Sequence, residues 1–483
     1  MSKILFINPN RWGRGITHIW LASHSGLIGK KHNIEFFDSS FFEDWAFDEV
    51  KLQTQNKNYK HTNYDNYRKF KKENIFSKLQ EKVDKFNPDI IFWSAISSHI
   101  HGEGEYVNIQ NGYDLVNKIN TKGSLKITAG LQATSAPEII LEKMPKIDFL
   151  IMGESEVILN KILNHIDEAK DFSQINGLAY KKQTKFVKNQ RQEVLENLDE
   201  LTPYNYDIFD DEVFLRPYNG KLVRAVDYEM SRGCIYSCSY CVETIIQKYY
   251  NFTESSSSTG SIKNFKSYLR SKSPKNVLIE LKKLVNDKKI ELIRCQDTNF
   301  LTNERKILTE LADLILKENL KFKLYIETRP EGINQASVDL LKKLNVDGVG
   351  MGIELADEDF RELSLNRFAS QSKTISAFEL LRKNGIKRTA YNIIGLPNQN
   401  EESILKTIEF NKQLDPDNIT VAFYSPYYGT KSQIDGKEAG IFDDYEFDVD
   451  SALRTKSKDT DLLPVDKLKF YKQNFVKLVR NEI

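Results

Sequence analysis

The first 170 residues alternate between short apolar runs and longer stretches in which apolar side chains recur with a helical period. The apolar runs predict buried strands at residues 4–7, 34–37, 90–93, 126–128 and 149–152. The helical repeats predict helices at residues 19–28, 76–86, 113–120, 137–143 and 157–166. Because strands that alternate with helices pair in parallel, we predict a doubly wound α/β domain over residues 1–170.

The same alternation returns in the second half of the chain. Six strands are predicted at residues 225–229, 291–295, 322–326, 349–353, 389–394 and 420–423. Helices are predicted between them, at residues 274–285, 304–317, 337–344, 372–383 and 401–413. Six strand–helix units predict a partial (β/α)6 barrel of the TIM type over residues 223–430, with its functional groups at the carboxyl ends of the strands.

Three further segments lie outside these repeats. Residues 45–75 are polar and show no clear period, so we expect an exposed excursion there. Residues 171–222 read as a polar linker with short strands near residues 178–180 and 185–187. Residues 431–483 form a C-terminal extension, whose amphipathic stretch at 465–480 predicts a helix that caps the barrel.

Composition narrows the possible functions. Apolar residues make up 40% of the 483 residues and charged residues 28%, as in soluble globular proteins, and the net charge is only +1. A nearly neutral chain is unlike a typical nucleic-acid binder, and no apolar run reaches the roughly 18 residues that span a bilayer. We expect a cytoplasmic protein that binds neither nucleic acid nor membrane.

Small and polar residues follow the predicted N-terminal strands. Since ligands of doubly wound sheets bind outside the carboxyl ends of the strands, these residues are candidates to line a pocket for a large polar cofactor. Ordinary turn chemistry is the alternative, because turns favour the same residue types. The candidates are Asn8, Pro9, Ser94, Ser97, Gly130, Gln132, Thr134, Gly153 and Glu154.

The strongest chemical signal is a cluster of cysteines. Cys234, Cys238 and Cys241 follow the spacing C-x3-C-x2-C, and Gly233 allows a tight turn before the first of them. Three thiolates from one loop suit a [4Fe–4S] cluster that keeps one iron open for a substrate or cofactor. A zinc site with a distant histidine and three unlinked buried thiols are the alternatives. Cys295 ends a predicted strand and is either a fourth ligand or a buried bystander.

This segment resembles the radical S-adenosylmethionine (SAM) superfamily, whose motif is C-x3-C-x-aromatic-C. Tyr240 supplies the aromatic residue, and Ser231-Arg232-Gly233 is similar to the version in cobalamin-dependent members. The resemblance implies that SAM chelates the open iron and is cleaved to a 5'-deoxyadenosyl radical, with Tyr240 near the adenine.

The polar ends of the barrel strands are similar to SAM-binding segments of the same superfamily. The resemblance implies acceptors for the ammonium and ribose of SAM at Asp297 and Glu354, and a cation for its carboxylate at Arg329. A structural ion pair is the alternative for each of these three residues. The remaining candidates in these segments are Gly352, Asn392 and Pro397.

The N-terminal half then resembles the flavodoxin-like or Rossmann-like cobalamin-binding domain that precedes the barrel in one subfamily. The matching features are residues 7–9, 87–91, 130–134 and 147–156. The chain departs from many cobalamin domains in lacking Asp-x-His-x-x-Gly, so we predict that no histidine lies below the cobalt. It also carries Ala129-Gly130 where a Gly-Gly pair is usual.

Together the resemblances imply a cobalamin-dependent radical SAM methyltransferase that acts on an unactivated carbon or a phosphinate phosphorus. A non-methylating cyclisation, ring contraction or rearrangement is the first alternative, and an iron–sulfur or corrinoid sensor without catalysis is the second. The implied partners are a small-molecule or natural-product-type substrate and an electron donor such as flavodoxin or ferredoxin.

Overall fold

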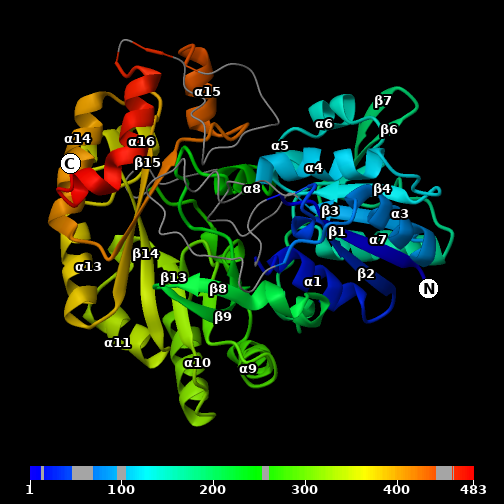
Figure 1. Cartoon of the computed structure of the whole chain (residues 1–483), viewed down its shortest axis with the longest axis horizontal. Coiled ribbons are helices and arrows are strands. Elements are labelled where there is room, and N and C mark those ends of the chain that lie inside the picture. The colour runs from blue at the N-terminus through cyan, green and yellow to red at the C-terminus, as the bar shows by residue number, and fades with distance from the viewer. Residues whose placement is uncertain (12–15, 46–68, 95–104, 253–259, 442–458, 461) are drawn as a thin grey trace. The chain divides into compact units, whose positions relative to one another are not determined.

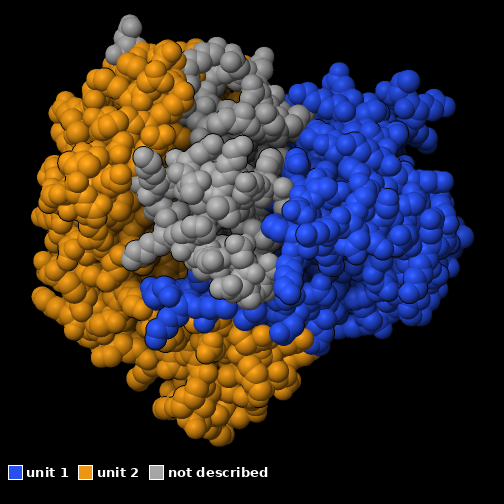
Figure 2. Space-filling model, in the orientation of Figure 1, with its two compact units in different colours: residues 1–49, 62–222, 245–251 blue, residues 50–61, 223–244, 252–483 orange. Residues whose placement is uncertain are grey.

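A computed structural model describes the chain except for residues 12–15, 46–68, 95–104, 253–259, 442–458 and 461. The described chain divides into two compact units (Figure 2). Unit 1 contains Met1–Glu49, Thr62–Leu222 and Ile245–Asn251, and unit 2 contains Val223–Thr244 and Phe252–Ile483. Most of the predicted excursion at residues 45–75 lies outside the described residues.

Unit 1 is built on a sheet in the order β2-β1-β3-β4-β5-β6-β7 (Figure 1). The first five strands are parallel, and the order 2-1-3-4-5 is that of a flavodoxin-like doubly wound sheet. The strands are β1 (Lys3–Asn8), β2 (Asn33–Asp38), β3 (Ile90–Ser94), β4 (Leu125–Ala129), β5 (Phe149–Ile151), β6 (Leu178–Lys182) and β7 (Lys185–Lys188). The predicted doubly wound fold is confirmed, and β6 and β7 extend its sheet with antiparallel pairing.

Helices follow each parallel strand of unit 1. They are α1 (Ile19–Ile28), α3 (Ile75–Phe86), α4 (Glu105–Asn117), α5 (Leu131–Ser135), α6 (Pro137–Lys143) and α7 (Glu156–Asp167). Every helix predicted in this half is present, but α4 begins at Glu105 and not at residue 113. The apolar period is weak between residues 105 and 112, where Asn108 and Asn111 are buried with the apolar side chains.

Unit 2 contains the predicted partial barrel. Its six parallel strands run in the order β9-β12-β13-β14-β15-β16, with β8 (Leu215–Tyr218) next to β9. The strands are β9 (Lys221–Tyr228), β12 (Leu292–Cys295), β13 (Lys323–Thr328), β14 (Val346–Glu354), β15 (Lys387–Ile394) and β16 (Asn418–Phe423). A separate two-stranded ribbon pairs β10 (Ser231–Arg232) with β11 (Arg270–Ser271).

The helices predicted between the barrel strands are also present. They are α9 (Pro274–Lys282), α10 (Arg305–Lys317), α11 (Gln335–Lys343), α13 (Gln371–Lys383) and α14 (Glu401–Leu414). Among the residues described after 222, four more helices occur, of which only the last was predicted: α8 (Glu243–Tyr249), α12 (Glu358–Leu365), α15 (Lys431–Glu438) and α16 (Val465–Val479). In the part of the chain that the structure describes, no helix has the length and apolar character to cross a bilayer.

Candidate functional site

The three cysteines of the motif lie on one loop that leaves the β10–β11 ribbon. The backbone N–H of Cys241 donates to the carbonyl of Cys238 at 3.1 Å, which folds the last turn of the loop. Gly233 has a φ of +91°, and a Cβ there would lie 2.5 Å from the carbonyl oxygen of Tyr268. Only glycine fits this turn, so the sequence before Cys234 fixes the start of the loop.

Burial controls the protonation of these thiols. It raises the pKa of Cys234 to about 12 and that of Cys241 well above its usual range, and the neighbouring Cys238 raises both pKa values further. Metal binding must therefore release protons from this loop. Among the described residues, no three Cys, His, Asp or Glu side chains surround one metal-ion position. A [4Fe–4S] cluster takes each thiolate on a different iron, and this loop can supply three such thiolates.

Asp297, the predicted acceptor after β12, anchors this loop. Its Oδ1 accepts from the backbone N–H of Met230 at 2.8 Å, from the N–H of Ser231 at 3.2 Å and from the thiol of Cys295 at 3.2 Å. Its Oδ2 accepts from the hydroxyl of Ser231 and from the amide of Asn303 at 3.1 Å. These donors use the four or so lone-pair sites of a carboxylate, so Asp297 binds the stem of the cysteine loop.

Glu354 and Tyr240, two of the predicted site residues, contact each other in the structure. The hydroxyl of Tyr240 donates to Oε1 of Glu354 at 2.9 Å, and Nη1 of Arg367 lies 3.6 Å from the same oxygen. Glu354 adopts a φ of +60° where the β14–β15 register shifts, a backbone conformation that is rare for a side chain of this size. Arg367 also donates to the carbonyl of Gly352, and a Cβ on Gly352 would lie 2.3 Å from Glu354 Oε1.

Arg329 approaches the cysteine loop directly. Its Nη1 lies 3.7 Å from the sulfur of Cys238, and its guanidinium stacks on the ring of Tyr236, with 3.7 Å to the ring centroid. Two of its nitrogens donate to Glu331 Oε1, at 3.0 and 2.6 Å. Arg329 therefore places a buried cation beside one of the three cysteine sulfurs.

Two predicted residues of the barrel have side chains outside this group, although Asn392 is the register partner of Glu354 across β14 and β15. The side chain of Asn392 exchanges hydrogen bonds with Asn411 of α14, at 3.2 and 2.8 Å, and so faces the helical layer outside the sheet. Pro397 is buried in the turn after β15, where Gln399 Oε1 accepts from the N–H of Gly395 at 2.7 Å. Neither side chain contacts Tyr240, Glu354 or Arg329 through a hydrogen bond in the described structure.

The predicted residues of unit 1 lie at the carboxyl ends of its strands. The Thr134 hydroxyl joins two of these ends, since it donates to the carbonyl of Gly130 at 2.8 Å and accepts from the N–H of Gly153 at 2.9 Å. Gly130 has φ +123° and ψ −165°, a conformation essentially restricted to glycine. The N–H of Glu154 donates to the hydroxyl of Tyr250 at 2.9 Å.

The other candidates lie at the carboxyl ends of β1 and β3, the neighbouring strands from which the strand order runs in opposite directions. Asn8 donates to Asp38 at 2.8 Å, Pro9 accepts from the indole of Trp45 at 3.2 Å, and Ser94 is buried. The predicted residue Ser97 lies outside the described residues.

Gln132 tests whether unit 1 fits a large polar cofactor. The side chain is fully buried, and in the described structure neither its amide nitrogen nor its amide oxygen has a hydrogen-bond partner. A buried unpaired polar group costs about 1–3 kcal/mol, so this amide suits a ligand that supplies the missing partners. The corrin ring and its tail carry many amide groups, and the end of β4 therefore fits cobalamin.

Comparison with protein families identifies the part of the chain that carries the cysteine loop. Residues 228–410 match the family described as the radical SAM superfamily. This part of the chain is a radical SAM domain. A [4Fe–4S] cluster and SAM, which the sequence predicted, are the cofactors that this superfamily requires.

Two curated relatives extend the likeness beyond the radical SAM domain. An uncharacterized methyltransferase of Pyrococcus horikoshii is 24% identical over 356 residues, which cover 74% of this chain and 71% of the relative. An anaerobic magnesium-protoporphyrin IX monomethyl ester cyclase of Rubrivivax gelatinosus is 24% identical over 372 residues, which cover 76% of this chain and 61% of the relative.

A solved structure shares the fold over nearly the whole chain. The radical SAM methyltransferase TsrM of Kitasatospora setae, solved with cobalamin and a [4Fe–4S] cluster, superposes with a TM-score of 0.64 at 15% identity. The superposition covers 92% of this chain and 76% of TsrM. The prediction of a doubly wound domain followed by a radical SAM barrel is confirmed at the level of the fold.

Two functional candidates of the radical SAM domain were missed from the sequence. Arg367 comes from the segment after α12, a helix that was not predicted, and Glu331 follows Arg329 in a short turn. Desolvation lowers the pKa of the buried Arg367, but Tyr240, Glu354 and Cys238 together raise it well above its usual range, so Arg367 is a fixed cation beside the site. A lone arginine between two helices has no spacing that marks it in sequence.

Proposed function

We propose that this chain is a cobalamin-dependent radical SAM enzyme and that it transfers a methyl group to an unactivated carbon or a phosphinate phosphorus of a small molecule. The observation that carries the proposal is the position of the three-cysteine loop, held by Asp297 and flanked by Arg329. When bound, the cluster and SAM supply a one-electron cleavage that yields a 5'-deoxyadenosyl radical.

The residues around the loop suit the polar groups of SAM. Arg329 and Arg367 are buried cations that can hold its carboxylate, while Glu331 and Glu354 balance their charge. Tyr240 and Glu354 would offer a phenol and a carboxylate to the adenine and ribose of SAM. Asp297 acts as a positioning residue for the loop, because its oxygens are occupied by the loop stem.

The candidate cobalamin site would use the carboxyl ends of the unit 1 strands. The glycine conformation at Gly130 and the unpaired amide of Gln132 support this role. The name of the Pyrococcus relative and the cofactors of TsrM support methyl transfer with cobalamin.

A second candidate is a radical cyclisation without methyl transfer. The Rubrivivax cyclase, which matches over a similar share of this chain, favours it. The two reactions differ in their use of SAM: methyl transfer consumes two molecules per turnover and labels the product from the methyl group of SAM.

Anaerobic reconstitution tests the proposal. We expect the protein to bind four irons, to show a cobalamin absorption spectrum, and to release 5'-deoxyadenosine when reduced with SAM present. Cys234→Ala should abolish the iron and the deoxyadenosine, whereas the matched control Cys295→Ala should keep both. Zinc in place of iron, or iron that depends on Cys295, would contradict the radical reaction. Incubation of a small-molecule extract with methyl-labelled SAM then separates methyl transfer from cyclisation.

A further inference from the structure

A second polar group lies on the inner face of the barrel sheet, nearer the middle of the strands than the SAM-binding candidates. We call it the inner cluster and define it as Asp227, Arg294, Tyr325, Glu327 and Tyr391. Asp227, Arg294 and Tyr325 are direct register partners across β9, β12 and β13, so their side chains form one row on one face. Glu327 is on the same face of β13, two residues beyond Tyr325 and two before Arg329.

Glycines on β14 bring distant strands of this cluster together. Gly350 is the register partner of Glu327 and has no side chain on the inner face. A Cβ on Gly350 would lie 2.5 Å from a ring carbon of Tyr391 and 2.8 Å from the hydroxyl of Tyr325. The space left by Gly350 therefore lets Tyr391 of β15 cross β14 and donate to Glu327 Oε1 at 3.0 Å, while the two tyrosine hydroxyls lie 2.8 Å apart.

Glu327 keeps one oxygen available. Among the described residues, Tyr391 is its only hydrogen-bond partner, and that bond uses Oε1. The second oxygen, Oε2, accepts no hydrogen bond from a described residue, and the residue is 7% exposed. Tyr325, Tyr391 and Arg294 are also partly exposed on this face.

The charges of the inner cluster do not cancel. Arg294 is the one cation of the cluster: it lies 4.0 Å from Asp227 and also attracts the charge of Glu327, so two carboxylates share one positive charge. Glu354, the next carboxylate toward the ends of the strands, is already matched by Arg367. The inner face therefore carries a net charge of about −1 at the position of Glu327 when this carboxylate is ionised.

We propose that Glu327, together with Tyr391 and Tyr325, is a substrate-binding subsite that takes a protonated amine of the substrate. An ammonium group supplies N–H donors to Oε2 and to the phenol oxygens, and its charge compensates the buried carboxylate. The subsite rests on the proposed function, because it places a substrate in the interior of the radical SAM barrel. It deepens that function by limiting the substrate to amine-bearing small molecules.

The same groups should make amine binding depend on pH. Burial raises the pKa of Glu327 to about 7, Glu354 raises it further, and Arg294 and the hydrogen bond from Tyr391 oppose the rise. Only the ionised carboxylate attracts a cation, while an alkylammonium stays charged to well above pH 9. Amine binding should therefore strengthen as the pH rises through about 7 and level off above it.

The test measures binding and needs no turnover. Equilibrium dialysis against the reconstituted protein with SAM compares the binding of three probes of equal chain length: hexylammonium, hexanol and hexanoate. We expect hexylammonium to bind more tightly than the other two, and Glu327→Gln to weaken its binding about 10- to 100-fold, the range of a charge-assisted hydrogen bond. The variant should also lose the dependence on pH near 7.

A second variant covers the case in which Glu327→Gln does not fold. Tyr391→Phe removes one neutral acceptor and a hydrogen bond to the ionised carboxylate but keeps the charge of Glu327, so it should move the pH midpoint of binding upward and weaken binding at high pH less than Glu327→Gln does. Equal binding of hexanol or hexanoate, or unchanged hexylammonium binding in Glu327→Gln, would overturn the subsite. Deoxyadenosine release on reduction is scored separately, so failure of the subsite and failure of the radical reaction are distinguishable.

Discussion

At the scale of single residues, the structure gives Asp297 a role different from the one that its position suggests. It follows a barrel strand, where the resemblance implies a contact to SAM, yet its two oxygens accept from Met230, Ser231, Cys295 and Asn303. It is 1% exposed, and burial raises its pKa while these hydrogen bonds oppose the rise. The carboxylate is thus stabilised by the loop that it holds.

Asp297→Asn should reduce the iron content of the reconstituted protein. Asparagine has an NH2 donor in place of one of the two acceptor oxygens. This NH2 group must face the donors on either the Oδ1 side or the Oδ2 side, and each buried donor that loses its acceptor costs about 1–3 kcal/mol. Iron analysis and the cluster absorbance measure the loss.

Asp347→Asn is the matched control, since Asp347 pairs with Lys323 at 2.8 Å near the start of β13 and is 20% exposed. Asp347→Asn should lower the free energy of unfolding by less than about 1 kcal/mol, so the iron content should stay unchanged. If Asp297→Asn kept full iron but weakened SAM binding, Asp297 would be a SAM ligand and not an anchor.

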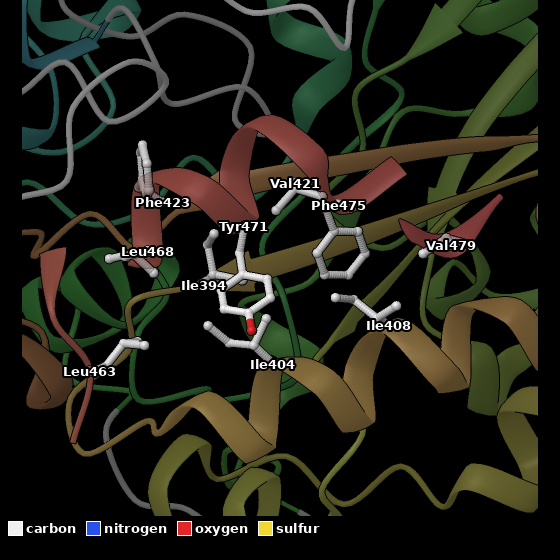
Figure 3. Packing of buried hydrophobic residues seen from close by; sticks show 10 residues of the cluster. All are labelled: Ile394, Ile404, Ile408, Val421, Phe423, Leu463, Leu468, Tyr471, Phe475 and Val479. Carbon is white, nitrogen blue, oxygen red and sulfur yellow. The ribbon is translucent and has the colours of Figure 1, made fainter. Parts of the chain in front are cut away.

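At the scale of elements, the C-terminal helix α16 covers the edge strand of the barrel. Its buried stripe packs against β16 and α14 around one apolar cluster (Figure 3). Polar contacts fix the register: the Tyr471 hydroxyl donates to Glu401 at 2.7 Å, and Lys472 donates to the carbonyl of Val421. An open barrel leaves the backbone of its last strand unpaired on one side, and α16 protects that edge.

Phe475→Ala should lower the free energy of unfolding by about 3–5 kcal/mol, because the ring is fully buried and its removal leaves a cavity. Phe470 lies on the same helix but is 49% exposed, so Phe470→Ala should change the free energy of unfolding by no more than about 0.5 kcal/mol. Chemical denaturation of the two variants gives the comparison. Equal effects would mean that α16 does not dock through the apolar stripe.

At the scale of the whole molecule, the chain passes between the two units more than once. Ile245–Asn251, which follow the cysteine loop closely, belong to unit 1. Within unit 1, Tyr250 is buried, and its hydroxyl accepts from the N–H of Glu154. Gly153 allows this packing, since a Cβ there would lie 2.4 Å from that hydroxyl.

Tyr250→Ala should therefore loosen unit 1, although residue 250 follows the metal-binding motif in the sequence. Hydrogen exchange measured by mass spectrometry should show faster exchange around residues 153–156, with the strands of unit 2 unchanged. Tyr250→Phe keeps the ring and loses only the hydroxyl, so its effect should be smaller. Faster exchange confined to the barrel strands would contradict the assignment of this segment to unit 1.

The sequence by itself determined the two folds and the metal motif, because these depend on local patterns. Apolar periodicity specified the parallel strands of both units and most of the helices between them, and the C-x3-C-x2-C spacing with Gly233 specified the loop. Only the tertiary structure decided what the isolated polar residues do. Asp297 and Asn392 are saturated by partners from other segments, while Arg367 and Glu327 acquire their neighbours across strands and helices far apart in the chain. A charged side chain gains its role from the partners and the burial that folding supplies, and neither leaves a periodic signal in sequence.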